Sequence, residues 1–118
     1  GSSAFQDSMI NYIFISKNVF KIGYSSFQNC KYLKNVDFHH DSKIEIISSH
    51  AFHGSAIENF SMPPTVIQCD YNAFILCDKT KIIELSENLK KFPLHKIPSF
   101  NREVVIMVPA NLSKNCFG

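Results

Sequence analysis

Four of the five histidines form two groups that could bind a metal ion. His39 and His40 precede Asp41, and His50 and His53 lie three residues apart, a spacing that places two side chains on one face of a helical turn. Imidazole and carboxylate groups are common ligands of zinc. The repeat pattern described below puts the first group at the end of a strand and the second on the opposite side of its unit. Three or four ligands are therefore not expected to converge, and we predict solvated histidines without a bound metal.

The four cysteines lack the Cys-x2-Cys spacing of zinc sites. Cys30 and Cys77 occupy the same repeat position two units apart, so their Cα atoms should lie about 10 Å apart at a strand spacing of about 4.8 Å. A disulfide bond needs a separation below about 7 Å. Cys69 stands at an apolar position, and Cys116 lies near the last residue. We expect reduced cysteines that pack as small hydrophobic side chains.

Other catalytic and ligand-binding patterns are missing from the sequence. It contains no Gly-x-Ser-x-Gly motif, phosphate-binding loop or His-Glu-x-x-His motif. The acidic residues share no repeat position that would pair two carboxylates, as the positions of Glu45, Glu58, Asp70, Asp78, Glu84 and Glu87 show. The sequence therefore predicts a protein without catalytic residues, metal or cofactor.

Composition and charge narrow the class of partner. An apolar fraction of 45% with 19% charged residues is typical of a folded domain. The net charge is only +2, and the basic residues form no stripe of the kind that binds nucleic acid. No apolar run approaches the roughly 18 residues of a membrane span. We expect a protein partner, no nucleic acid and no direct membrane insertion.

A repeat of 22 to 25 residues organises the chain. A small residue followed by phenylalanine recurs in a series of four, spaced 22, 25 and 22 residues apart, and an apolar-x-apolar strand signal follows each copy and recurs once more at Ile106-x-Val108. Near-constant spacing in this range is typical of a stacked solenoid. The repeated pairs are Ala4-Phe5, Ser26-Phe27, Ala51-Phe52 and Ala73-Phe74, and the strand signals before the last are Ile13-x-Ile15, Val36-x-Phe38, Phe60-x-Met62 and Ile83-x-Leu85.

Each unit has the same predicted parts. The phenylalanines should stack in a column at the centre of the core, where each buried ring contributes about 1.5 to 3 kcal/mol. After the strand comes a polar corner and a second apolar pair with spacing three, such as Val19 and Ile22 or Ile44 and Ile47. We predict parallel strands on one face of the solenoid, and short helical turns around the phenylalanines with extended segments on the other.

The array is expected to be continuous. We expect residues 1–118 to form a single array of about four and a half units that is a fragment of a longer array. The fourth unit departs from the pattern between Pro93 and Phe100, where Ile97 takes the phenylalanine position and two prolines disfavour a regular turn.

The units resemble the BspA-type leucine-rich repeat over nearly the whole chain. The matching runs are Ile22-Gly23-x-x-Ser26-Phe27-x-x-Cys30-x-x-Leu33-x-x-Val36-x-Phe38, Phe60-x-Met62-Pro63-Pro64-Thr65-Val66 and Ile106-x-Val108-Pro109. The chain departs from the family pattern in Cys69, in the missing proline of three units and in the broken fourth turn. The resemblance implies a non-enzymatic cell-surface or extracellular protein that adheres to host cells, extracellular matrix or other microbes.

Residues between the buried strand positions should point outward and form the binding face, because side chains alternate along a strand. Exposed aromatic and methionine side chains among polar ones suit a protein-binding surface. Neighbouring coils or regions outside this chain could instead cover them. The residues predicted for this face are Tyr12, Phe14, Asn35, Asp37, Asn59, Ser61, Ile82, Glu84 and Met107.

Two other roles remain open at this point. An intracellular scaffold would use the same face for cytoplasmic partners, and unpaired cysteines favour a reducing compartment. A structural spacer between an anchor and a distal domain would not use the face at all. The family resemblance favours the cell surface, and a cytoplasmic location stays possible.

Overall fold

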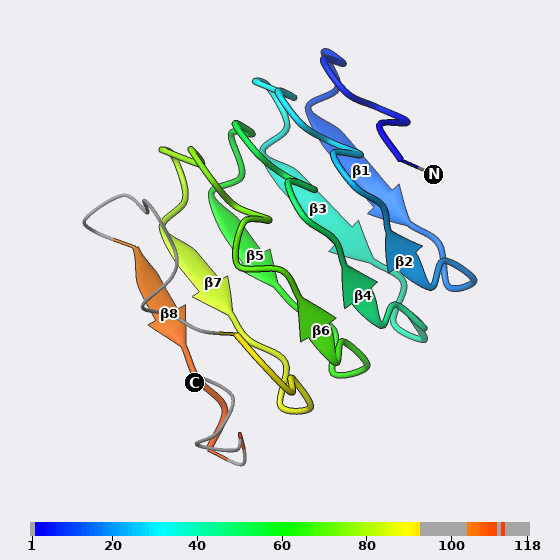
Figure 1. Cartoon of the computed structure of the whole chain (residues 1–118), viewed down its shortest axis with the longest axis vertical. Helices are drawn as coiled ribbons and strands as arrows, with labels where there is room; N and C mark the ends of the chain where they lie inside the picture. Colours follow the sequence, from blue (N-terminus) through cyan, green and yellow to red (C-terminus); the bar gives the residue numbers. More distant parts are fainter. Residues whose placement is uncertain (1, 93–103, 111, 113–118) are drawn as a thin grey trace.

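Every strand in the described part of the chain pairs in parallel with a strand one coil away. The computed structural model describes residues 2–92, 104–110 and 112. Figure 1 shows the coils following one another in sequence order, from the blue N-terminal coil to β8. The strands of the predicted strand face are β1 (Tyr12–Ile15), β3 (Asn35–Phe38), β5 (Asn59–Ser61), β7 (Ile82–Glu84) and β8 (Val105–Met107).

A second row of short strands lies on the return segments. These strands are β2 (Lys21–Ile22), β4 (Ile46–Ile47) and β6 (Gln68–Cys69), and they form one parallel sheet in the order β2-β4-β6. The bridge between Gln68 and Lys91 extends this row by one more pair. The predicted parallel solenoid is therefore confirmed, with a strand side and an extended return side in each coil.

The segments around the phenylalanines are tight turns, and the predicted helical turns are not found in the described residues. The residues two before and two after Phe27, Ser25 and Asn29, have left-handed backbone angles of φ 55° and 60°. Ser3 and Asp7 flank Phe5 in the same way, as do His50 and Gly54 around Phe52. Alternating backbone handedness prevents a continuous helix, because a right-handed helix needs consecutive residues in one conformation.

These turn segments form backbone hydrogen bonds with the next coil. The amide N–H groups of Phe5, Phe27 and Phe52 donate to carbonyl oxygens of the following coil, each at 2.8 Å. The left-handed residues on either side do the same, as in Ser25 to Ser49 at 3.1 Å and Asn29 to His53 at 2.7 Å. The turns are thus tied coil to coil, as the strands are.

The phenylalanine column is confirmed. Ring centroids lie 5.3 Å apart between Phe5 and Phe27, 5.4 Å between Phe27 and Phe52, and 5.5 Å between Phe52 and Phe74. Phe60 from the strand side packs against two rings of this column, at 5.2 Å from Phe52 and 5.0 Å from Phe74. Only Phe5, at the end of the column, is substantially exposed, at 43%.

The apolar strand positions face the core as predicted, with one exception. Val36, Phe60 and Ile83 are buried, and Ile13 and Ile106 are half-buried. Val108, predicted to be the second buried residue of the last strand signal, is instead 47% exposed. It lies just beyond the end of β8, where the described residues provide no further coil to pack against it.

The strand-face ladder is interrupted between β3 and β5. β1 and β3 form one sheet, and β5, β7 and β8 form another. The amide of Glu58 still donates to the carbonyl of Lys34 at 3.4 Å, but the strands themselves do not pair. The gap coincides with a longer corner after β3. Val36 and Ile44 are eight residues apart, whereas the equivalent positions are six apart in the other coils, as in Ile13 and Val19.

The described cysteines are free and buried, as predicted. The Cys30 and Cys77 thiols each donate a hydrogen bond at 3.0 Å to a backbone carbonyl of the preceding coil, that of Phe5 and that of Phe52. Desolvation raises the pKa of all three thiols. They therefore stay protonated at neutral pH and act as packing groups. Cys116 and the irregular stretch from Pro93 to Phe100 with Ile97 lie outside the described residues.

The phenylalanine column yields a stability prediction. Phe52→Ala removes a ring that is fully buried between two others, and we expect the free energy of unfolding to fall by about 3–5 kcal/mol. Phe5→Ala removes a half-exposed ring at the end of the column and should cost about 1 kcal/mol. Urea unfolding followed by circular dichroism measures both. Equal losses for the two variants would contradict the role of the column.

Candidate protein-binding face

All the residues predicted for the binding face are exposed on the strand side. The strands alternate in burial, as in the exposed-buried-exposed patterns of β5 and β7. Their buried central residues, Phe60 and Ile83, join the core, so the residues on either side point outward. The exposed set comprises Tyr12, Phe14, Asn35, Asp37, Asn59, Ser61, Ile82, Glu84 and Met107.

Apolar side chains gather at the two ends of this face. Tyr12 and Phe14 on β1 are 47% and 50% exposed, and Met107 on β8 is 46% exposed. Val105 is exposed beside Ile82, its register partner. Between the ends, polar residues take the outward positions of β3 and β5. The face thus has two separate apolar areas with a polar centre.

Register brings apolar and acidic groups side by side. Phe14 pairs with Asp37 across β1 and β3, and Met107 pairs with Glu84 across β8 and β7. Desolvation and the interaction of the Tyr12 hydroxyl with the Asp37 carboxylate raise the pKa of Tyr12. Tyr12 is therefore a neutral hydrogen-bonding aromatic group at physiological pH, a side-chain type that is common in protein interfaces.

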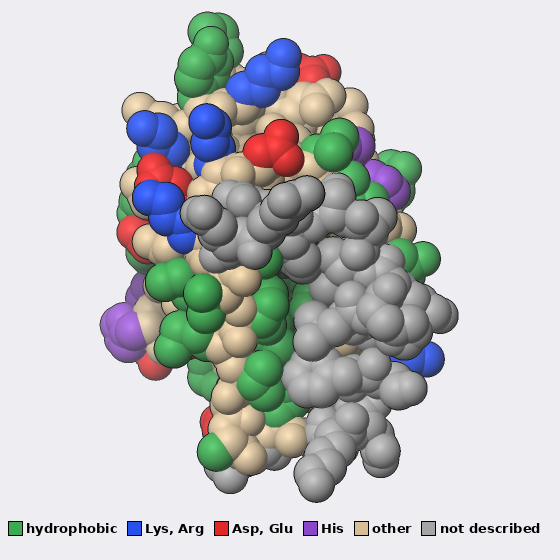
Figure 2. All heavy atoms as spheres, turned by 90° about the vertical axis from the view of Figure 1, so that its left-hand side faces the viewer, with side chains coloured by type: hydrophobic (Ala, Val, Ile, Leu, Met, Phe, Trp, Pro, Cys, Tyr) green, Lys and Arg blue, Asp and Glu red, His purple; other side chains and the backbone are tan. Residues whose placement is uncertain are grey.

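Sequence reasoning missed several exposed apolar side chains outside this face. Phe20 follows Val19 on the return side, Tyr24 lies three residues before Phe27, and Tyr32 lies in the turn before β3. Each is more than half exposed. The repeat contained a signal for Phe20, because it stands between the two core-facing positions, half-buried Val19 and buried Ile22, and must point elsewhere. Figure 2 shows hydrophobic side chains at the surface among polar and charged ones.

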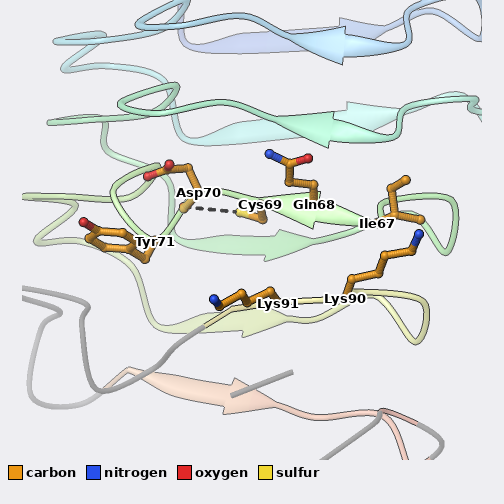
Figure 3. A pocket seen from close by; sticks show the side chains of 7 residues that line it. All are labelled: Ile67, Gln68, Cys69, Asp70, Tyr71, Lys90 and Lys91. Carbon is orange, nitrogen blue, oxygen red and sulfur yellow. Dashed lines mark hydrogen bonds between the residues drawn. The ribbon is translucent and has the colours of Figure 1, made fainter. Parts of the chain in front are cut away.

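A hollow of about 430 Å³ lies on the return side, away from the strand face. Figure 3 shows that β6 and the residues after it line one side, and that Lys90 and Lys91 line the other. Asp70 and the two lysines bring opposite charges to it. The Cys69 thiol is buried and bonds to the Asp70 carbonyl at 3.7 Å, so it offers no reactive group. We assign no catalytic role to this hollow.

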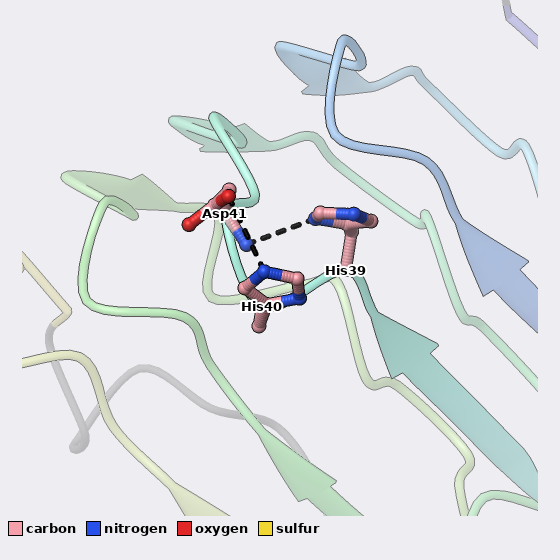
Figure 4. A group of neighbouring side chains, drawn as sticks. All are labelled: His39, His40 and Asp41. Carbon is pink, nitrogen blue, oxygen red and sulfur yellow. Dashed lines mark hydrogen bonds and ion pairs between the residues drawn. The ribbon is translucent and has the colours of Figure 1, made fainter.

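The first histidine group is closer together than predicted. One ligand atom from each of His39, His40 and Asp41 lies within 4.8 Å of the others, as Figure 4 shows for the corner after β3. The expectation that three ligands do not converge is therefore wrong for this group. It failed because it weighed convergence between the two histidine groups and did not consider that the turn after β3 brings three consecutive residues of one group together.

The second histidine group stays separate from the first. The rings of His50 and His53 lie 5.3 Å apart, and the ring of Tyr24 lies 5.7 Å from His50. The Ser49 hydroxyl lies 2.7 Å from Nδ1 of His50. Nδ1 of His53 is buried without a hydrogen-bond partner. Desolvation and the neighbouring His50 lower the pKa of His53.

The chain matches the BspA type leucine rich repeat region over residues 1–117, in six copies. It therefore belongs to the BspA-type leucine-rich repeat family, as its repeat pattern predicted. Leucine-rich repeat solenoids generally serve as protein-interaction modules, because stacked repeats create extended binding surfaces. A comparison with curated proteins finds no match.

Two solved structures share the fold. One is the pneumococcal vaccine antigen PcpA, with a TM-score of 0.70 and 29% identity over 75% of this chain. The chain spans 22% of the length of that structure. The other is a leucine-rich repeat protein of T. pallidum, with a TM-score of 0.62 and 18% identity. The match covers 98% of this chain and 68% of the T. pallidum protein.

The described residues contain no helix with the length and apolarity of a membrane span.

The lowered pKa of His53 yields a pH prediction. Because the pKa of His53 is lower in the folded state than the ordinary value of about 6.5, the unfolded state binds a proton more readily. The stability contributed by neutral His53 is therefore fully present above about pH 6.5 and is lost as the pH falls below that value. The urea midpoint should fall between pH 7 and pH 5.5, and His53→Gln should reduce this fall. An identical fall in the wild type and His53→Gln would contradict the prediction.

Proposed function

We propose that this solenoid is a protein-recognition or adhesion module that binds its partner through the strand face. The observation that carries the proposal is the exposure of Tyr12 and Phe14 on β1 and of Met107 on β8, all on the strand face. Exposed apolar side chains on a sheet cost solubility unless a partner covers them. Family membership supports the same class of function.

The shape of the face favours a broad contact with a folded protein. The hollows beside it are shallow and open, so a small ligand would remain largely in solvent. Aromatic and methionine side chains commonly carry much of the binding energy in protein interfaces. We expect Tyr12 and Phe14 to form one contact area and Ile82, Val105 and Met107 the other. The polar residues between them would supply hydrogen bonds.

We propose that this module acts at the cell surface. The structural likeness to PcpA, which is described as a vaccine antigen, supports it. Partners would then be host-cell or extracellular-matrix proteins. The second candidate is an intracellular scaffold, which the free buried cysteines favour because oxidised pairs are typical of secreted domains.

Binding to extracellular-matrix proteins tests whether the strand face is the binding surface. Purified chain is passed over immobilised fibronectin, laminin and fibrinogen in a surface plasmon resonance experiment. Binding to at least one of them is expected, and the variant Tyr12→Ser/Phe14→Ser/Met107→Ser should weaken it about 100-fold or more, because each lost hot-spot side chain costs about 1–2 kcal/mol.

A matched variant controls for nonspecific apolar binding. Phe20→Ser/Tyr24→Ser/Leu76→Ser changes three side chains of similar exposure outside the strand face. It should bind as the wild type does. Equal weakening in both triple variants would contradict the assignment to the strand face, and failure to bind any matrix protein would contradict the adhesion role.

Antibody labelling separates the two candidate locations. Cells that make the full-length protein are labelled with an antibody to this chain, before and after permeabilisation. Signal on intact cells is expected if the module acts at the surface. Signal that requires permeabilisation would favour the intracellular scaffold, with lysed cells as the control for antibody reactivity.

A further inference from the structure

The corner after β3 departs from the repeat in both length and composition. Eight residues separate Val36 from Ile44, against six at the other three corners, as in Phe60 and Val66. The longer corner contains His39, His40 and Asp41. The other corners, such as Ser16-Lys17-Asn18, contain no histidine. The solenoid does not need this extension, because the shorter corners close their coils without it.

The extended corner is held at both ends by backbone hydrogen bonds. The His39 amide donates to the Ile15 carbonyl of the preceding coil at 3.0 Å, and the Ser42 amide donates to the His39 carbonyl at 2.9 Å. The ring of Phe14 packs edge-on against His39, with centroids 6.2 Å apart. The backbone that carries the three side chains is therefore fixed before any ligand binds.

Figure 4 shows the three side chains lying together. The rings of His39 and His40 stack with centroids 4.3 Å apart, and Nε2 of His40 lies 3.3 Å from the Asp41 carboxylate. The side chains of His40 and Asp41 are 82% and 69% exposed. A hydrated ion can thus reach the group from solvent without opening the fold.

We propose that His39, His40 and Asp41 form a binding site for a divalent transition-metal ion such as zinc. Two imidazoles and one carboxylate are a donor set that zinc accepts in proteins, with water or another donor in the fourth position. In the metal-free chain Nδ1 of His39 accepts a hydrogen bond from the Asp41 amide at 2.9 Å. Coordination through this nitrogen exchanges that hydrogen bond for the metal bond.

The position of the site suits contact with a partner. His39 and His40 line a hollow of about 380 Å³, and Asp37 of the strand face lines the same hollow. With three protein ligands, the ion keeps a coordination position that a partner carboxylate or imidazole can fill. The ion would then lie beside the strand face rather than in the core.

Isothermal titration with Zn²⁺ tests the proposal on the full 118-residue chain. Reductant and a Cys116→Ser background remove binding by that thiol, and circular dichroism verifies folding of every variant. We expect one ion per chain. His40→Gln and Asp41→Asn should each weaken binding at least about tenfold, since loss of even an outer-shell partner costs a metal site 10- to 100-fold.

The other histidine pair provides the matched control. His50→Gln/His53→Gln removes as many imidazoles as the proposed site contains and should leave the affinity unchanged. Absence of Zn²⁺ uptake would overturn the proposal, as would uptake that His40→Gln and Asp41→Asn do not alter. Weakening by the control variant equal to that by His40→Gln would overturn it too, because the binding would then not belong to this corner.

Discussion

The stacking of one phenylalanine on the next sets the arrangement of all the other elements. Phe27 and Phe52 lie between rings of neighbouring coils, and their own amides donate to carbonyls of the next coil. The stacked rings and the backbone hydrogen bonds therefore both hold neighbouring coils together at the phenylalanine turn. Left-handed residues flank Phe5, Phe27 and Phe52 on both sides, and every second amide of the turn, as at Ser25, Phe27 and Asn29, donates to the next coil. Non-glycine residues such as Ser25 and Asn29 accept this conformation at an energetic cost, which coil-to-coil hydrogen bonding offsets.

The strand face is a consequence of this arrangement. Once the column fixes the coils, each strand must keep its central apolar residue in the core, as Phe60 and Ile83 do. The residues before and after it then point to solvent, where packing no longer restricts their type. Tyr12 and Asn35 can therefore occupy equivalent positions in neighbouring coils. The outward positions are free to vary with the partner, while the inward positions must repeat.

The sequence could predict what depends on the repeat and could not predict what depends on backbone angles. The phenylalanine column, the buried cysteines and the outward residues follow from spacing and alternation. The expected helical turns are not found, because left-handed residues such as Ser25 and Asn29 interrupt them. Serine carries no signal for this conformation, whereas asparagine and glycine, present at Asn29 and Gly54, favour it. The sequence gives no signal for the gap between β3 and β5, which coincides with the longer corner after β3. Val108 was assigned to the core because its strand signal is complete, although the next coil that would bury it is not among the described residues.

A solenoid can place polar or metal-binding groups at irregular segments, although its regular repeat positions exclude them. Inward positions are filled by apolar side chains, so a charged or metal-binding group there would lack solvation. Outward strand positions point away from the core, and the side chains at paired positions one coil apart differ in type, as those of Phe14 and Asp37 do. An extended corner is free of both restrictions, because its backbone can turn and bring consecutive side chains together. His39, His40 and Asp41 meet for this reason. This extended corner also accompanies the break in the strand ladder, so the polar cluster lies beside the place where the strand face is divided.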